Sequence, residues 1–261
     1  MKTKLIDKTG KAGKEVELPK VFSGRIRADI LQKVFEVQKA TLKNVYGSMI
    51  GAGAGYSASG ISIKARHQWK GTYGKGISRV PRKIMSRNGA SFNWVGATVA
   101  SARGGRKPHA PKTAKNLFKK INKKELVIAF GSGFAGTVDS KSIEDKYGKK
   151  IDSGFVVSAD VLKLKTKDFV ALLKAAFGEN YEKALKVKKV RAGKGTMRGR
   201  KYRSSAGLLV VIGSEEKMNR KGVDVVNANE LLISDLAPNG VAGRLAVYSE
   251  EAVKEIAEKF K

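Results

Sequence analysis

Aromatic and cationic side chains are interleaved in the central part of this sequence. Arg66-His67-Gln68-Trp69-Lys70 is followed by Tyr73 and, further along, by Phe92-Asn93-Trp94. Ammonium and guanidinium groups bind phosphates, and aromatic rings stack on unpaired bases. The combination predicts nucleic-acid binding. Because the surrounding chain is irregular and rich in glycine, it suits folded RNA better than the groove of a regular duplex.

The candidate RNA-binding residues lie in two runs without any acidic residue, Val37 to Lys124 and Val187 to Arg203. A charge run is usually a solvated face, but both of these are internal, and the first contains both tryptophans and both histidines. The candidates are Lys64, Arg66, His67, Trp69, Lys70, Tyr73, Lys75, Arg79, Arg82, Lys83, Arg87, Trp94, Arg103, Arg106, Lys107, His109, Lys112, Lys115, Lys119, Lys120, Lys123, Lys124, Arg191, Lys194, Arg198, Arg200, Lys201 and Arg203.

The overall charge also points to a polyanionic partner. The 261 residues include 53 Lys and Arg against 23 Asp and Glu, which gives a formal charge of +30. Self-repulsion of this size opposes a compact monomer unless a polyanion neutralises it. The absence of cysteine excludes disulfides and thiolate metal sites. No apolar run approaches the roughly 18 residues of a membrane span, and the start lacks a signal-peptide core, so we expect a soluble intracellular protein.

The elements that position the candidates are predicted on either side of an open stretch. No helix or strand periodicity persists from Tyr46 to Lys115. We therefore expect an extended RNA-binding loop at 46–115, inserted into a globular domain formed by 1–45 and 116–261. Short apolar runs predict buried strands at Phe155–Val157, Leu208–Ile212, Val223–Val226 and Leu245–Val247. Because helical segments separate them, they predict a largely parallel sheet with helices on both faces.

Other segments of the expected domain have weaker patterns. Alternation predicts a short hairpin within Leu5–Leu18, and apolar residues three and four apart predict a helix over Arg25–Asn44. Glu125–Phe134 fits either a helix or a strand. Gly131-Ser-Gly133-Phe-Ala-Gly136 has the spacing of a dinucleotide-binding motif, which requires a helix after it. Because Thr137–Lys150 is polar and turn-like, we interpret these glycines as close packing at a chain turn.

No set of residues predicts catalysis. His67 and His109 have no carboxylate near them in the sequence, and two histidines without cysteine make a poor metal site. Gly193-Lys194-Gly195-Thr196 lacks the spacing of a phosphate-binding loop. We expect no enzyme activity, no cofactor and no metal. Two alternatives stay open: an RNA-acting enzyme with a nucleotide-binding α/β domain, and a general nucleic-acid packing protein.

Four longer stretches are distinctive in their order along the chain. They are Gly104–Lys112 (GGRKPHAPK), Lys120–Glu125 (KINKKE), Arg191–Arg203 (RAGKGTMRGRKYR) and Asp235–Leu245 (DLAPNGVAGRL). Together they resemble the archaeal and eukaryotic branch of the universal large-subunit ribosomal protein family “L-four”. Lys70-Gly71-Thr72, with Ser78 and Pro81 after it, resembles the loop tip of the bacterial branch.

The resemblance implies a fold and a role. The fold is α/β, a three-layer α/β/α sandwich with a mainly parallel four-stranded sheet and a very long internal basic loop. The role is structural: early binding of large-subunit ribosomal RNA and contacts with neighbouring large-subunit proteins, in a cytoplasmic, ribosome-bound protein. The loop tip is implied to line the polypeptide exit tunnel and to meet the nascent chain there. The residues implied at the tip are Arg66, Trp69, Lys70, Gly71, Thr72 and Arg79.

Overall fold

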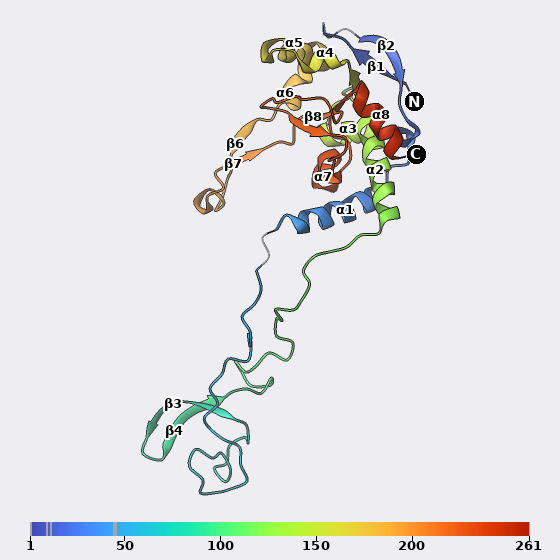
Figure 1. Ribbon diagram of the computed structural model, residues 1–261. Helices are drawn as coiled ribbons and strands as arrows, with labels where there is room; N and C mark the ends of the chain where they lie inside the picture. Colours follow the sequence, from blue (N-terminus) through green and yellow to red (C-terminus); the bar gives the residue numbers. More distant parts are fainter. Residues whose placement is uncertain (1, 9, 11, 44–45, 261) are drawn as a thin grey trace. The chain divides into compact units, whose positions relative to one another are not determined.

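A computed structural model describes residues 2–8, 10, 12–43 and 46–260 of the chain, which divides into two compact units. We call Met1–Lys43 together with Phe118–Lys261 the body, and Asn44–Leu117 the insert. The body contains a six-stranded sheet with its helices, and the insert contains a two-stranded hairpin (Figure 1). Within the described ranges, no helix is both long and apolar enough to cross a membrane.

The sheet of the body has the strand order β2-β1-β5-β10-β8-β9. β1 and β2 are antiparallel, and every other neighbouring pair is parallel. The strands are β1 (Lys2–Ile6), β2 (Ala12–Glu17), β5 (Phe155–Val157), β8 (Leu209–Ile212), β9 (Asp224–Asn227) and β10 (Ala246–Ser249). The prediction of a mixed α/β fold with a mainly parallel sheet is confirmed.

The sheet has six strands instead of the four expected. β5, β8, β9 and β10 are the four strands predicted from apolar runs, and the hairpin predicted within Leu5–Leu18 supplies β1 and β2. β1 joins the sheet because Leu5 and Ile6 pair in parallel with Val156 and Val157. This pairing joins residues far apart in the sequence, and local periodicity therefore indicates the hairpin without indicating its neighbour in the sheet.

Helices connect the strands at positions that local sequence explains. In α1 the buried residues Ile30, Leu31 and Val34 follow the predicted spacing of three and four. α8 begins where Ser249 Oγ accepts a hydrogen bond from the backbone N–H of Ala252 at 3.1 Å. The helices of the body are α1 (Ala28–Thr41), α2 (Lys123–Val138), α3 (Ser140–Tyr147), α4 (Ala159–Leu162), α5 (Thr166–Phe177), α6 (Tyr181–Ala184), α7 (Ile233–Leu236), α8 (Glu250–Lys259), and the 3-10 helices η1 (Lys20–Ser23), η2 (Gly178–Asn180), η3 (Thr196–Arg198) and η4 (Pro238–Gly240).

Alternate residues of the parallel strands belong to two separate apolar clusters. Val156, Val211 and Tyr248 pack in one cluster with buried residues of α1, α2, α7 and α8. Val157 and Val210 pack in the other with buried residues of α3, α4 and α5. Because successive side chains of a strand point to opposite faces, the two clusters cover the two faces of the sheet.

α2 includes the segment whose pattern fitted either a helix or a strand. Gly133 and Gly136 lie in it where a Cβ atom would come within 3.1 Å of Leu236 and 2.7 Å of Ala242. Their predicted role in close packing is confirmed, but the predicted chain turn is wrong because the motif lies inside the helix. The turn-like interpretation of the following residues is wrong as well. α3 forms there because its Ile143 is completely buried.

The insert contains an antiparallel hairpin of β3 (Arg82–Asn88) and β4 (Ser91–Gly96). Its two-residue turn begins at Gly89, whose φ of +56° suits a hairpin turn with glycine first. The expectation of no strand between Tyr46 and Lys115 is therefore wrong for this part. The turn residues are Gly89 and Ala90, and the alternation on either side of them is brief, which is why a search for sustained periodicity passes over this hairpin.

Candidate nucleic-acid interface

Three aromatic residues form a small cluster within the insert. The ring centroids of Phe92 and Trp94 are 5.1 Å apart in a stacked arrangement, and Trp69 meets Phe92 edge-on at 5.1 Å. Phe92 and Trp94 alternate on β4, so their side chains share one face of the hairpin. The cluster supplies the insert with apolar contacts that composition alone did not indicate.

Cations from β3 and from the loop before it lie close to these rings. The Nζ atom of Lys75 lies 5.3 Å from the centroid of Phe92 and 5.1 Å from that of Trp94. The guanidinium groups of Arg82 and Arg87 lie 5.9 Å from the rings of Trp94 and Trp69 respectively. Each such contact is worth about 0.5–1 kcal/mol at an exposed site. The interleaved rings and cations thus contact one another within the insert, a contact that the sequence did not predict, while Trp69 keeps 51% of its surface exposed.

The loop that precedes β3 is folded through backbone hydrogen bonds. Ile61 N–H donates to Lys70 O at 3.0 Å, and Thr72 N–H donates back to Ile61 O at 3.1 Å. Gly71 N–H donates to Gln68 O at 2.9 Å. Thr72 is only 1% exposed, and Gly71 is buried beside it. Of the six residues implied at the tip, these two lie inside the loop, whereas Arg66, Trp69 and Arg79 are exposed and Lys70 is half-buried.

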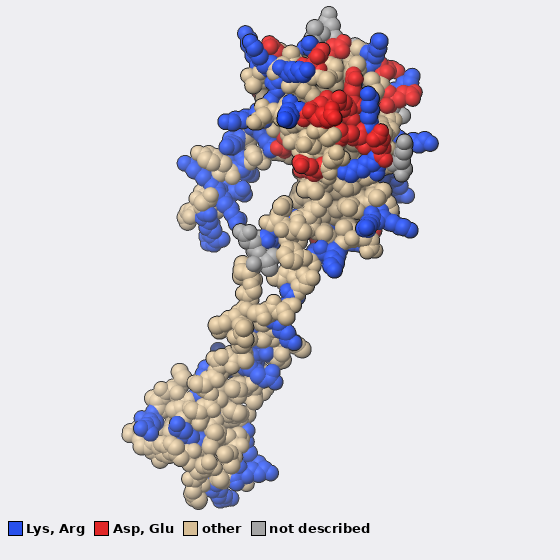
Figure 2. Space-filling view, in the orientation of Figure 1, with Lys and Arg blue, Asp and Glu red and all other residues tan. Residues whose placement is uncertain are grey.

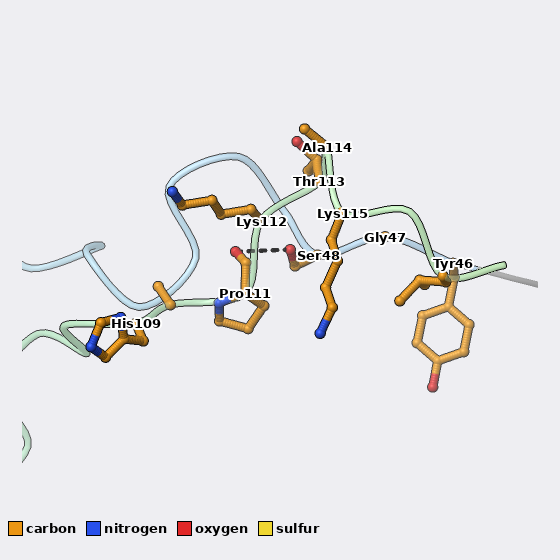
Figure 3. A pocket seen from close by; sticks show the side chains of 11 residues that line it. Tyr46, Gly47, Ser48, His109, Pro111, Lys112, Thr113, Ala114 and Lys115 are labelled. Carbon is orange, nitrogen blue, oxygen red and sulfur yellow. Dashed lines mark hydrogen bonds between the residues drawn. The ribbon is translucent and has the colours of Figure 1, made fainter. Parts of the chain in front are cut away.

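Two segments of the insert lie side by side. Residues 48–56 precede hairpin β3–β4 in the chain, and residues 105–111 follow it. Lys107 N–H donates to Gly53 O at 3.0 Å, and the Tyr56 hydroxyl donates to Gly105 O at 2.9 Å. Ser48 Oγ donates to Pro111 O at 3.2 Å across a groove of about 690 Å³ (Figure 3). His109, Lys112 and Lys115 line this groove together with Tyr46. The groove thus brings together three of the predicted RNA-binding residues. It is open to solvent, and no acidic residue lines it.

The other candidates of the insert differ in exposure. The exposed ones are Lys64, Arg66, His67, Trp69, Lys75, Arg79, Arg87, Arg103, Arg106, Lys107, His109, Lys112 and Lys115. The half-buried ones are Lys70, Tyr73, Arg82, Lys83 and Trp94. Tyr73 lies 4.9 Å from the guanidinium of Arg79, and Lys83 Nζ lies 5.8 Å from the ring of Tyr56. Arg82 Nη2 donates to Ser78 O at 3.1 Å and therefore holds the loop before β3.

Four candidates lie in the body near the start of α2. Lys119 donates to Glu36 Oε2 at 2.9 Å, and this contact holds the pKa of Glu36 below its ordinary value. Lys120 is exposed, and Lys123 and Lys124 occupy the first turn of α2. Cations are unfavourable at the amino end of a helix because the dipole is positive there. An anion bound beside them would remove this repulsion.

The remaining candidates lie on a second hairpin, formed by β6 (Lys188–Val190) and β7 (Tyr202–Ser204) in the body. It extends from the rest of the body, and η3 lies at its tip (Figure 1). Arg191, Lys194, Arg198, Arg200, Lys201 and Arg203 are all exposed on it. Lys188 and Lys189 belong to the same acid-free run and are also exposed on the hairpin, although neither was among the predicted RNA-binding residues.

The two units differ in their charges. The insert has thirteen Lys and Arg residues and no Asp or Glu, whereas all 23 acidic residues belong to the body. Figure 2 shows acidic side chains gathered on the body alone, and Lys and Arg side chains along hairpin β6–β7. Cations without intramolecular acids repel one another, and phosphates are their natural partners.

The carboxyl ends of the parallel strands do not form a phosphate site. In doubly wound folds, nucleotides bind in the crevice at these ends. Here the N–H of Gly213, just after β8, donates to Glu216 Oε2 at 2.8 Å and to Ser249 Oγ at 3.2 Å. A carboxylate in this position repels a phosphate. Among the described residues, no group of three or more His, Cys, Asp or Glu side chains is placed to hold a metal ion.

Residues 16–259 match the sequence profile of the ribosomal protein L4/L1 family. The chain belongs to this family. The family has a structural role, and its members are not enzymes. The resemblance carried by the four stretches is thereby confirmed over almost the full length.

Individual relatives agree with the family match. A large ribosomal subunit protein uL4 of Nanoarchaeum equitans is 35% identical in an alignment of 253 positions that covers 94% of this chain and 93% of the relative. The uL4 protein of Methanocaldococcus jannaschii is 33% identical in an alignment of 270 positions, gaps included, that covers both chains completely. The uL4 protein of Halobacterium salinarum is 33% identical over 269 residues, covering 99% of this chain and 100% of the relative.

Proposed function

We propose that this protein is a structural component of the large ribosomal subunit that binds large-subunit ribosomal RNA early in assembly and has no catalytic role. The family match over residues 16–259 is the observation that carries the proposal. The acid-free insert supports it, since thirteen cations without counter-charges are suited to the phosphates of a folded RNA. On the ribosome, the protein is located in the cytoplasm among neighbouring large-subunit proteins.

In this proposal residues 46–115 are the extended RNA-binding loop, and residues 1–45 and 116–261 are the globular domain that carries it. The exposed cations of the insert neutralise phosphates, and Trp69 offers an open ring face for stacking. Trp94 acts indirectly by holding Lys75 and Arg82 in place. The two apolar clusters support a three-layer arrangement of the domain.

The tip of the insert is proposed to line the polypeptide exit tunnel, where it meets the nascent chain. Arg66, Trp69, Lys70 and Arg79 present side chains at this tip. Gly71 and Thr72 contribute by shaping the loop, because the Thr72 side chain is turned inward. Deletion of residues 57–88 tests this role. Loss of cross-links between a nascent chain and the protein at the tunnel constriction is expected, and unchanged cross-links would contradict the assignment.

Competition binding tests the RNA role. The full chain is titrated with a large-subunit ribosomal RNA fragment against equal masses of duplex DNA and unrelated RNA over a range of salt. We expect the ribosomal RNA to be preferred, with a log–log salt slope near −7 if about ten single-stranded phosphates are neutralised. Equal affinity for all three competitors would favour a general nucleic-acid packing protein instead.

A further inference from the structure

One buried arginine holds the end of hairpin β6–β7 and is linked to its start through Asp224. Arg244, just before β10, is only 2% exposed. Its Nε donates to Gly207 O at 3.0 Å and its Nη2 to Ala206 O at 2.7 Å, at the end of the hairpin. Its Nη1 donates to Asp235 O at 2.7 Å. Nη2 also pairs with a carboxylate oxygen of Asp224 in β9.

Asp224 links Arg244 to the start of the hairpin. Its second carboxylate oxygen accepts a hydrogen bond from Nζ of Lys186, two residues before β6. The Lys186 backbone N–H donates to Gly222 O at 2.8 Å, which ties the same segment to the chain before β9. Arg244, Asp224 and Lys186 therefore connect the two ends of the hairpin with the edge of the main sheet. We call these three residues the base network.

Beyond the base network, Leu208 N–H donates to Ala184 O at 2.7 Å and Ser205 Oγ donates to Leu185 O at 3.4 Å, and both bonds tie the two ends of the hairpin together. The hairpin itself is short. Its ladder consists of only three residue pairs, and an isolated two-stranded hairpin is marginally stable in water. Val190, Tyr202 and Met197 are 63%, 55% and 80% exposed, so no apolar core lies beneath it. The base network is in contrast well satisfied, since all three nitrogens of the Arg244 guanidinium have acceptors. Its geometry decides where the hairpin points.

The register of the hairpin separates its cations into two faces. Lys189 lies opposite Arg203, and Arg191 N–H donates to Lys201 O two pairs further on. Residues two apart in a strand share a face at a spacing of about 6.6 Å, so these four cations form a two-by-two array. Lys188 belongs to the other face, with Val190. A groove of about 520 Å³ borders the array and includes Lys189 and Arg203 in its lining.

We propose that hairpin β6–β7 is a preformed phosphate-binding ribbon with one RNA-contacting face, to which Lys189 belongs, and that Arg244 is the positioning residue that aims it. This inference rests on the proposed function as an RNA-binding ribosomal protein. The base network fixes the direction of the ribbon before RNA arrives. The hairpin therefore loses its conformational entropy during folding. RNA binding then requires only that phosphates reach the four cations of the array.

Two neighbouring lysines test the choice of face in the full chain. Lys189→Ala removes one cation of the array, and Lys188→Ala is the matched control on the opposite face. With the ribosomal RNA fragment as the probe, we expect Lys189→Ala to weaken binding about tenfold and to reduce the salt slope by about 1. Lys188→Ala should stay within about twofold of the wild type with an unchanged slope. Equal effects of the two substitutions, or no change of slope in either, would overturn the proposed face.

Arg244→Lys tests the positioning role, because it keeps the charge and loses the planar fork. We expect hydrogen exchange at the backbone amides of β6 and β7 to become at least tenfold faster, with β8 and β10 still protected. RNA affinity should fall while the salt slope stays at the wild-type value, since the array itself is intact. Arg220→Lys is the control, because Arg220 binds the carbonyls of Leu162 and Leu164 elsewhere in the body.

A second variant, Lys186→Met, tests the same positioning role if Arg244→Lys does not fold. Lys186→Met removes one arm of the base network from a residue that remains partly exposed. It should accelerate exchange in β6 and β7 in the same selective way, by a smaller factor. Wild-type exchange in the hairpin of a folded variant would overturn the positioning role. If the wild-type chain shows no preference for ribosomal RNA, the proposed function fails; if that preference persists while the variants behave as the wild type, only this inference fails.

Discussion

The insert and hairpin β6–β7 are both acid-free and basic, yet they are ordered in different ways. The insert holds its cations with its own aromatic rings, as Lys75 and Arg82 over Trp94 show. Hairpin β6–β7 has one such contact, with Lys201 Nζ 5.7 Å from the ring of Tyr202, and its base is held by the ion network of Arg244, Asp224 and Lys186. The difference shows that cations can be positioned locally by rings or remotely by a buried ion network.

The largest expected effect is on the salt slope of RNA binding when each of the two basic regions is replaced separately. In one variant a short polar linker replaces residues 46–115, and in the other a tight turn replaces residues 187–204. The insert has thirteen Lys and Arg and the hairpin has eight, so the first change should reduce the salt slope of RNA binding more. Each lost phosphate contact changes the salt slope by about 0.7 to 0.9, so the upper limits of the change are about 12 for the insert and about 7 for the hairpin.

Measurement of binding to the ribosomal RNA fragment over a range of salt checks this contrast. Thermal unfolding of the body is the control, since both variants keep the six-stranded sheet. A larger loss of slope from the hairpin replacement than from the insert replacement would reverse the comparison. That result would place the principal RNA contacts in the body.

Glycine substitutions should distinguish the base of hairpin β6–β7 from its tip. Gly207 has a φ of +66°, and a Cβ there would come within 2.8 Å of Lys186 Cγ and 3.2 Å of Ala184 O. Gly193 has a φ of +85° with open space around it. We expect Gly207→Ala to lower the free energy of unfolding by about 3 kcal/mol, because overpacking adds to backbone strain. Gly193→Ala should cost about 1 kcal/mol.

Urea denaturation followed by circular dichroism provides the two free energies. Equal costs at the two positions would mean that the base of the hairpin adapts as easily as its tip. The base network would then not restrain the hairpin.

Trp94→Ala should weaken the order of the insert without affecting the body. The substitution removes the stacked contact with Phe92 and the ring beneath Lys75 and Arg82. We expect a local loss of about 2 kcal/mol, measured by hydrogen exchange at the amides of β3 and β4. Met85→Ala is the control, because Met85 is on the same hairpin and 67% exposed. Wild-type exchange in Trp94→Ala would show that the aromatic cluster does not order the insert.

Acid should affect the two hairpins differently, with the smallest effect of the series. Burial disfavours the ionised form of Asp224, but hydrogen bonds from Lys186 and Arg244 outweigh it and hold its pKa below the ordinary value. A lowered carboxyl pKa contributes stability that is present above the unfolded-state pKa, and this stability is lost as pH falls toward the folded-state value. Protection of β6 and β7 should therefore decline below about pH 4.

The insert has no carboxylate side chain, so β3 and β4 should show no transition of this origin. Hydrogen exchange at several pH values, corrected for the intrinsic rate, compares the two hairpins in one experiment. Asp224→Asn should remove the pH dependence from β6 and β7. Persistence of the transition in that variant would assign it to another group.

Several features of the fold followed from the sequence because their causes are local. Apolar runs predicted β5, β8, β9 and β10, and the spacing of Ile30, Leu31 and Val34 predicted α1. Hairpin β3–β4 was missed because its alternation is short and its Gly89-Ala90 turn lies within a glycine-rich stretch. α3 was missed because its polar sequence contributes few side chains, chiefly Ile143, to the core.

The sequence by itself determined where the charge lies and which family the chain belongs to, since composition and motif order need no contacts. Only the tertiary structure decided that β1 pairs with β5, that Thr72 turns inward, and that Arg244, Asp224 and Lys186 link the two ends of hairpin β6–β7. These features depend on partners distant in the sequence. Burial and hydrogen bonding bring such partners together only in the complete fold, so no local sequence pattern predicts them.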